Sequence, residues 1–233
     1  PYVLDYETLI PAGYKVQVDP GVIIYGKDKT SYFNVLGELE FNGEENNSVI
    51  ITSALDTNYV EDNKSAVTGD LAAGDWSRIQ VGSSGVLDST YTKFLYGGNE
   101  SFFQTGVFVG QIGHYKSNVV LNNGGQANIF NGEFYNNYTQ ADDDRAQYNS
   151  IVWSEDATTT ISNSVLNGGA NIGAVLYGGY VLLDGVTFSN LNMGLDMQNV
   201  GELEMQNITE NNFQNISDYN WFPTSTWAFP TSS

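Results

Sequence analysis

The chain has 233 residues, of which 41% are hydrophobic, and its formal net charge is −19, from 27 acidic residues against eight lysines and arginines. A surface this negative repels nucleic-acid phosphates and anionic lipid, so neither nucleic acid nor membrane insertion is expected. The apolar content is ample for a core, so the acidity does not indicate disorder. With no cysteine and no run of about 18 apolar residues, the sequence predicts no disulfide framework and no membrane-spanning helix.

The amino-terminal segment, 1–30, predicts the start of a repetitive β structure. Turn signals stand at residues 11–13 (Pro-Ala-Gly) and 19–21 (Asp-Pro-Gly), and the short apolar or alternating runs at 14–18 and 22–25 are typical of strands. The end of a solenoid presents unpaired backbone groups and apolar core, which need cover. We therefore expect residues 1–30 to form an amino-terminal cap and the first coil.

The next segment continues in the same way. In residues 31–55, apolar side chains recur at every second position, interrupted once by Gly37, and an Asn-Gly turn at 42–43 then leads to a second apolar run. This pattern predicts strand, turn and strand. Residues 56–73 are mostly polar and are expected to form a loop excursion, after which residues 74–76 (Gly-Asp-Trp) begin the next coil.

A short pattern recurs along the rest of the chain: an apolar residue, a spacer, Asn or Asp, Ser or Gly, and further apolar positions. Its Asn or Asp falls at Asp88, Asn131, Asn163, Asp184 and Asn207, and the last three follow one another at nearly equal intervals. A strand-and-turn repeat of about 20–25 residues is typical of a solenoid. The sequence therefore predicts an all-β fold, a right-handed parallel β-helix solenoid of about seven to nine coils, forming a single domain whose helix spans residues 31–215.

Two intervals are wider than the repeat. The interval from Asp88 to Asn131 allows two coils, or one coil with an excursion, and the apolar residues in 99–116 favour a packed excursion. The interval from Asn131 to Asn163 includes a polar loop at 138–149. Insertions in solenoids collect on one face, which is often the binding face. Residues 216–233 are rich in aromatics and proline and are expected to form a cap, with a linker or a contact to another domain or subunit as the alternative.

The order of these segments resembles the right-handed parallel β-helix repeat proteins of cell surfaces, within the pectate-lyase-like superfamily. The segments that carry the resemblance are residues 10–13, 18–22, 35–39, 49–53, 74–76 and 94–98. The resemblance implies the fold and leaves the activity open, because this scaffold hosts lyases, hydrolases, adhesins and structural parts.

Few residues suit catalysis. A lyase of this fold needs a Lys or Arg base, and among the eight basic residues Arg78, beside Trp76, is the best placed. A glycosidase needs several Asp residues near a histidine and a basic anchor, and the single histidine, His114, lacks such companions. We therefore assign no catalytic residue and expect a non-enzymatic module. The alternatives are a polysaccharide lyase or glycoside hydrolase, and a viral fibre or tailspike.

Candidate ligand sites fall at turns and loops. Asp142, Asp143 and Asp144 offer oxygen ligands for calcium, against the alternative of a solvated acidic loop, and no other cofactor is implied. Trp153 is expected to face the core. Candidate stacking platforms for a sugar are the four tyrosines at predicted turn or loop positions, namely Tyr135, Tyr138, Tyr177 and Tyr180.

Six Asn-X-Ser/Thr sequences are candidate glycosylation sites. They begin at Asn46, Asn63, Asn99, Asn137, Asn207 and Asn215. Together these features predict an extracellular or cell-surface protein, namely a structural or adhesive module of a surface or appendage protein. Its expected partners are a glycan or protein at a cell surface, or further copies of itself joined end to end.

Overall fold

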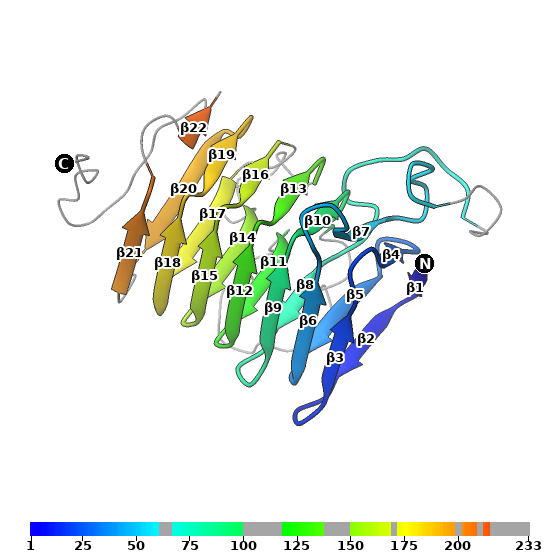
Figure 1. The fold of residues 1–233 in the computed structure, drawn as a ribbon, viewed down its shortest axis with the longest axis horizontal. Coiled ribbons are helices and arrows are strands. Elements are labelled where there is room, and N and C mark those ends of the chain that lie inside the picture. The colour runs from blue at the N-terminus through cyan, green and yellow to red at the C-terminus, as the bar shows by residue number, and fades with distance from the viewer. Residues whose placement is uncertain are drawn as a thin grey trace, which may run out of the picture.

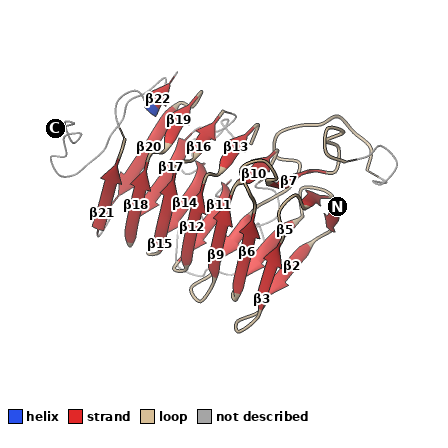
Figure 2. Cartoon of the chain, in the orientation of Figure 1, coloured by secondary structure: helices blue, strands red, loops and turns tan. Residues whose placement is uncertain are grey.

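The computed structural model describes residues 1–60, 67–99, 118–137, 150–168, 172–198, 202–208 and 212–214. These residues form a parallel β-helix, in which each coil contributes one strand to each of three sheets (Figures 1 and 2). Every pairing between named strands is parallel and joins one coil to the next, so the predicted all-β solenoid is confirmed. Within the described part of the chain, no helix has the length and apolar character needed to cross a membrane.

The three sheets contain eight, seven and seven strands. The first sheet consists of β1 (Tyr2–Leu4), β4 (Ile23–Gly26), β7 (Val49–Ser53), β10 (Thr92–Leu95), β13 (Glu133–Tyr135), β16 (Val165–Asn167), β19 (Thr187–Ser189) and β22 (Phe213–Gln214). The second consists of β2 (Glu7–Ile10), β5 (Tyr32–Val35), β8 (Ile79–Val81), β11 (Asn118–Asn123), β14 (Ser150–Glu155), β17 (Ile172–Tyr177) and β20 (Met193–Gln198). The third consists of β3 (Lys15–Val18), β6 (Glu38–Asn42), β9 (Val86–Thr90), β12 (Gln126–Phe130), β15 (Thr158–Ser162), β18 (Tyr180–Asp184) and β21 (Glu202–Gln206). The described residues thus make seven full coils, within the predicted number, and β22 begins an eighth.

The wide intervals in the repeat are explained by excursions. β9 pairs directly with β12, and β12 pairs directly with β15, so each wide interval corresponds to one coil with additional residues. This confirms the prediction of one coil with an excursion between Asp88 and Asn131. Whether that excursion packs on the solenoid concerns residues 100–117, which lie outside the described residues, as do residues 138–149.

The corner between the third and first sheets corrects the predicted register. Asn131, Asn163, Gly185 and Asn207 have left-handed backbones, with φ of 53°, 49°, 62° and 50°. The amide of each of the first three donates a hydrogen bond to a carbonyl of the next coil. Asp184 does not share this position, because it pairs with Ser162 and Gln206 at the end of the strands. A left-handed corner selects glycine or asparagine, so Gly185 occupies it, and the corners at Asn163, Gly185 and Asn207 are evenly spaced along the chain.

Asp88 was likewise misplaced by the repeat pattern. It lies within β9, opposite Asn128 of β12, whereas the left-handed corner of its coil is Tyr91, with φ of 44°. The Asn/Asp pattern therefore identifies the corner directly at Asn131, Asn163 and Asn207, misses it by one residue at Asp184 and misses it by three residues at Asp88.

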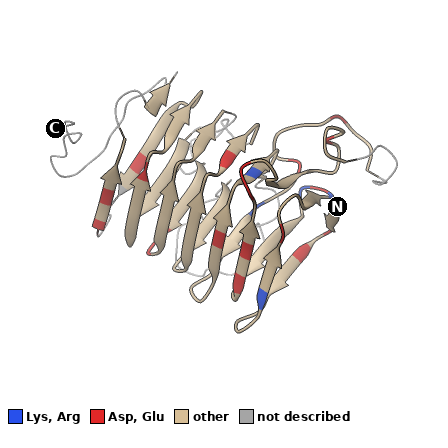
Figure 3. Ribbon diagram, in the orientation of Figure 1, with Lys and Arg blue, Asp and Glu red and all other residues tan. Residues whose placement is uncertain are grey.

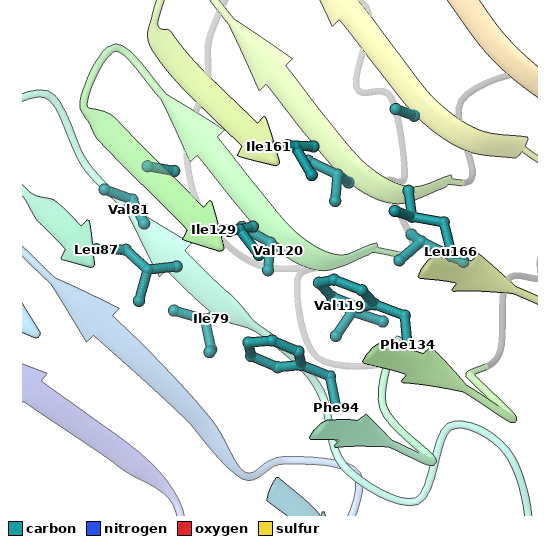
Figure 4. Close-up of a cluster of buried hydrophobic side chains, with 14 of the residues drawn as sticks. Ile79, Val81, Leu87, Phe94, Val119, Val120, Ile129, Phe134, Ile161 and Leu166 are labelled. Atoms are coloured by element: carbon teal, nitrogen blue, oxygen red, sulfur yellow. The ribbon is translucent and has the colours of Figure 1, made fainter. Parts of the chain in front are cut away.

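Side chains that point inward stack from coil to coil and form one continuous core. Figure 4 shows its central part, where Ile79 lies near Val120 and Ile129 pairs with Ile161 of the next coil, and Leu87 belongs to the same cluster. Phenylalanines from the first sheet complete this cluster. Because each inward residue lies above a counterpart in the next coil, apolar side chains are buried along the whole described solenoid.

Trp153 is buried but does not face this main core, so the predicted placement is wrong. Its ladder partners are Leu121 and Val175, with which it forms a separate apolar cluster. Its neighbour Val152 belongs to the main core, and successive residues of a strand point to opposite faces. Trp153 therefore packs on the outer face of the second sheet. The prediction had aligned it with Val81 and Leu176, each of which lies one ladder position away.

The amino-terminal end forms a coil without the predicted cap among the described residues. β1, β2 and β3 are the edge strands of the three sheets and pair directly with β4, β5 and β6. No described strand lies beyond them. Residues 1–30 therefore supply the whole first coil and the start of the second, and the edges of β1, β2 and β3 lie at one end of the solenoid (Figure 1).

Candidate binding surface on the third sheet

The outer face of the third sheet carries three rows of outward residues in continuous register. The strands alternate buried and more exposed positions, which directs every second side chain away from the core. The first row is Lys15, Glu38, Val86, Gln126, Thr158, Tyr180 and Glu202; the second is Gln17, Glu40, Asp88, Asn128, Thr160, Leu182 and Glu204; the third is Asn42, Thr90, Phe130, Ser162, Asp184 and Gln206. Neighbouring members of a row are about 4.8 Å apart along the ladder.

This outer face is strongly acidic. Its seven strands contain six carboxylates, on β6, β9, β18 and β21, and Lys15 is their only lysine or arginine. Figure 3 shows the acidic positions on β6, β9 and β21 and the single basic position on β3. The face therefore attracts cations and repels anions such as polyuronates.

Hydrogen bonds and ion pairs run along the rows. The ammonium of Lys15 lies 3.4 Å from Glu38 and also contacts Glu40, and Gln17 donates a hydrogen bond of 2.6 Å to Glu40. Farther along, Asn128 Nδ2 donates to Asp88 Oδ1 at 2.6 Å. The hydrogen bond to Glu40 raises the pKa of Lys15, and the hydrogen bonds from Lys15 and Gln17 lower the pKa of Glu40. Both groups are therefore held in their charged forms.

Two of the predicted tyrosines meet at the corner beside this face. Tyr177 ends β17 and Tyr180 begins β18, and the turn between them consists of Gly178 and Gly179, with φ of 67° and 68°. Tyr177 is 37% exposed. Burial raises the pKa of Tyr180, and Glu204 raises it further through its charge and a hydrogen bond. Tyr180 therefore keeps its proton at neutral pH and can act as a hydrogen-bond donor.

The remaining predicted ligands are not brought to this corner. Tyr135 lies on β13 in the first sheet, where burial and the charge of Glu133 raise its pKa. Tyr138 and the run Asp142, Asp143 and Asp144 lie outside the described residues, so the calcium site stays a prediction. Among the residues that are described, no group of three or more His, Asp or Glu side chains is arranged to hold a metal ion.

The candidate glycosylation sites differ in accessibility. Asn46 lies exposed in the turn after β6, and Asn207 is exposed at a corner, where its Nδ2 donates to Asp184 Oδ1 at 2.6 Å. Asn99 is buried. Asn137 is fully buried, and both ends of its amide are bonded: Oδ1 accepts from Gly97 N at 2.8 Å, and Nδ2 donates to the Phe94 carbonyl at 2.9 Å. Asn63 and Asn215 lie outside the described residues.

Arg78, the best-placed basic residue in the sequence, is only 3% exposed. Its carbonyl accepts a hydrogen bond from Phe33, and its charge acts on Tyr32. Burial, together with Glu7, raises the pKa of Tyr32 to about 12, against the opposing effect of Arg78. Arg78 thus belongs to the interior of the junction between β5 and β8 rather than to an open surface.

Sequence reasoning missed the rows themselves and one internal repeat. The residues Gly-Glu-Leu-Glu occur at 37–40 and again at 201–204. The two copies form β6 and β21, and their glutamates occupy the same two outward rows. The repeat is visible in the sequence. Its alignment in the sheet is not, because excursions of different length separate the coils between the two copies.

Comparison of the chain with protein-family models, with curated proteins and with solved structures gave no match. The resemblance found in the sequence therefore holds at the level of the parallel β-helix, which the structure shows directly. Membership of the pectate-lyase-like superfamily is a proposal.

Proposed function

We propose that this chain is a non-enzymatic extracellular module of a cell-surface or appendage protein, with a structural or adhesive role, and that it binds glycans at the outer face of the third sheet. The observation that carries the proposal is the set of three in-register rows, in which most side chains are carboxylates, amides or hydroxyls. A polar array held on a stiff ladder suits an extended ligand, because the outward positions recur at the same spacing from coil to coil.

The chemistry of the face favours neutral or amino sugars over uronates. Carboxylates accept hydrogen bonds from sugar hydroxyls, and amides both accept and donate them. The tyrosines at the adjoining corner provide an apolar ring with a polar end. Six carboxylates against one lysine repel a polyuronate chain and attract an amino group. Calcium is not required for this binding.

A glycan array probed with the full chain tests the proposal. We expect retention on neutral or amino glycans and none on uronate polymers, and we expect Tyr177→Ala combined with Tyr180→Ala to weaken the retention. Tyr14→Ala is the matched control, because Tyr14 is 68% exposed but lies in the first coil, at the other end of the solenoid. Equal binding by all three proteins, or preferential binding of uronates, would contradict the proposed site.

A further inference from the structure

The first coil leaves an open edge on which apolar side chains collect. β3 pairs with β6 on one side and with no described strand on the other. Among the described residues, nine large hydrophobic side chains are exposed, and six of them lie in residues 2–16: Tyr2, Val3, Tyr6, Leu9, Tyr14 and Val16. Val16 is 40% exposed although it stands in the inward row whose next member, Leu39, is fully buried. The core is therefore uncovered at this end.

The chain itself contains a strand that fits β3. On its paired side, β3 meets β6, whose sequence is Glu-Leu-Glu-Phe-Asn. Both glutamates form ion pairs with Lys15, and Glu40 also accepts the hydrogen bond from Gln17. The apolar Leu39 and Phe41 lie opposite Val16 and Val18. A strand of alternating glutamate and apolar residues is thus complementary to β3 in both charge and packing.

The last strand of the same sheet repeats this sequence. β21 is Glu-Leu-Glu-Met-Gln, and the ladder through the sheet places Glu202 in the row of Glu38 and Glu204 in the row of Glu40. Within the described residues β21 is the edge strand at the far end of the third sheet, opposite β3 (Figure 1). One end of the sheet therefore presents the sheet's only cation, and the other presents two carboxylates at matching positions.

We propose that a second copy of this chain docks on the open edge, with its β21 continuing the third sheet beside β3. In this register Glu202 of one copy lies opposite Lys15 of the next, and Glu204 lies opposite Gln17. Leu203 and Met205 cover Val16 and Val18, which closes the exposed core. The two surfaces in contact are different, and the step is a translation along the solenoid, so the contact does not close and its product is a filament.

For two copies to stack in this way, β1 of the incoming copy must take the place of β22. β22 begins the eighth coil of the first sheet, at the place that β1 of the incoming copy must take. β22 has two residues, paired with Phe188 and Ser189, whereas β1 has three. Tyr2 stands in the same inward row as Phe213, as the pairing of each coil with the next shows. The incoming β1 therefore replaces β22, and Tyr2, 67% exposed in the single chain, packs on Phe188.

Charge reversal of the full chain tests this interface. Light scattering across a concentration series should show a mass that grows with concentration for the native chain. Glu202→Lys combined with Glu204→Lys places like charges opposite Lys15, and should weaken association at least about tenfold. The control, Glu44→Lys combined with Glu45→Lys, makes the same change in net charge in the exposed turn after β6, on neither edge strand, and should associate like the native chain.

Mixing two charge-reversed proteins distinguishes loss of the interface from loss of folding. Lys15→Glu alone should also abolish association, but mixing it with the Glu202→Lys, Glu204→Lys protein should restore mixed pairs, because the two reversed edges are again opposite in charge.

A peptide of residues 201–207 should inhibit assembly of the native chain, and a scrambled peptide should not. A single-chain mass at all concentrations, or association insensitive to these reversals, would overturn the proposal. This inference extends the proposed structural role. Tyr177→Ala combined with Tyr180→Ala changes no residue of β3 or β21 and should associate like the native chain, so glycan retention by that protein reports the glycan-binding role separately.

Discussion

The ring of Phe94 stacks on the ring of Phe134 in the next coil, with the ring centroids 4.4 Å apart and the planes 9° from parallel. The two residues are directly paired between β10 and β13. Stacking of like side chains follows from the parallel ladder, because each residue lies one strand spacing above its counterpart. Both rings are fully buried, so this pair fills the interior where the first sheet faces the other two.

Phe134→Ala should lower the free energy of unfolding by about 3–5 kcal/mol, because it leaves a cavity beneath Phe94 that the rigid ladder cannot close. Chemical denaturation monitored by circular dichroism measures the effect. Phe130→Ala is the matched control: Phe130 stands on the neighbouring strand β12 but is 40% exposed, so its loss should change the free energy by no more than about 0.5 kcal/mol. Equal destabilisation by both variants would contradict the inward and outward assignment.

Gly179→Ala should be much more destabilising than Gly13→Ala. Both glycines have left-handed backbones, with φ of 68° and 82°, so each substitution costs about 1–2 kcal/mol for the backbone alone. A Cβ at Gly179 would overlap the Ala157 carbonyl oxygen, whereas a Cβ at Gly13 meets nothing within 4 Å. The crowding should add about 1–3 kcal/mol at Gly179. Denaturant midpoints of the two variants, compared with the native chain, give the difference directly.

The fold could be predicted from the sequence because its signals are local. Turn residues, period-two apolar runs and a recurring Asn or Asp are each visible within one coil, and they predicted the parallel solenoid and the coil with an excursion. Exact register was harder. The Asn/Asp pattern selects Asp184, but the left-handed corner is the adjacent Gly185, and only the backbone conformation distinguishes the two positions. The same one-residue error placed Trp153 on the wrong face, because a slip of one residue inverts every side chain of a strand.

The candidate surface was less accessible to sequence reasoning. Its rows combine one residue from each of six or seven coils, and excursions of different length separate those coils in the chain. Tyr177 and Tyr180 were predicted because a glycine turn between two tyrosines is a local signal. The alignment of Glu38 with Glu202 depends on five intervening pairings, and it becomes visible only when the whole ladder is known.

Glycosylation in a host that modifies Asn-X-Ser/Thr should occupy Asn46 and Asn207 in the folded protein and leave Asn137 unmodified. Asn46 and Asn207 are exposed, whereas a glycan on Asn137 would have to be joined to a fully buried Nδ2 that donates to the Phe94 carbonyl, so the site would have to open. Peptide mass spectrometry of the secreted, folded fraction reads the occupancy at each site. Finding a glycan at Asn137 in that fraction would contradict the buried position of its amide.

The contact between Lys15 and Glu40 should stabilise the fold in a pH-dependent way. The pKa of Glu40 is lowered from 4.5 by hydrogen bonds from Lys15 and Gln17, so its contribution is complete above pH 4.5 and is lost as the pH falls through the lowered value. The pKa of Lys15 is raised from 10.5, so its contribution is complete below pH 10.5 and is lost as the pH rises through the raised value.

Urea midpoints of the native chain and of Glu40→Gln, measured across pH, test this contact. Their difference should be constant near neutrality and should shrink below pH 4.5. Salt should reduce it, because Lys15 is exposed and Glu40 is partly exposed. Asp88→Asn is the control for loss of a carboxylate on the same face, because Asp88 accepts its hydrogen bond from the neutral amide of Asn128. A difference for Glu40→Gln that persists unchanged into acid would exclude the charged contact as its cause.

The purified chain should not cleave polygalacturonate or alginate, with or without calcium. The outer face of the third sheet repels uronates, and Arg78, the basic residue that the sequence singled out, is buried beside Tyr32. Assays for unsaturated products and for reducing ends cover the lyase and hydrolase alternatives separately. Polymer cleavage that Arg78→Ala or Asp143→Ala abolishes, while circular dichroism shows the variant still folded, would reverse the assignment of a binding or structural role.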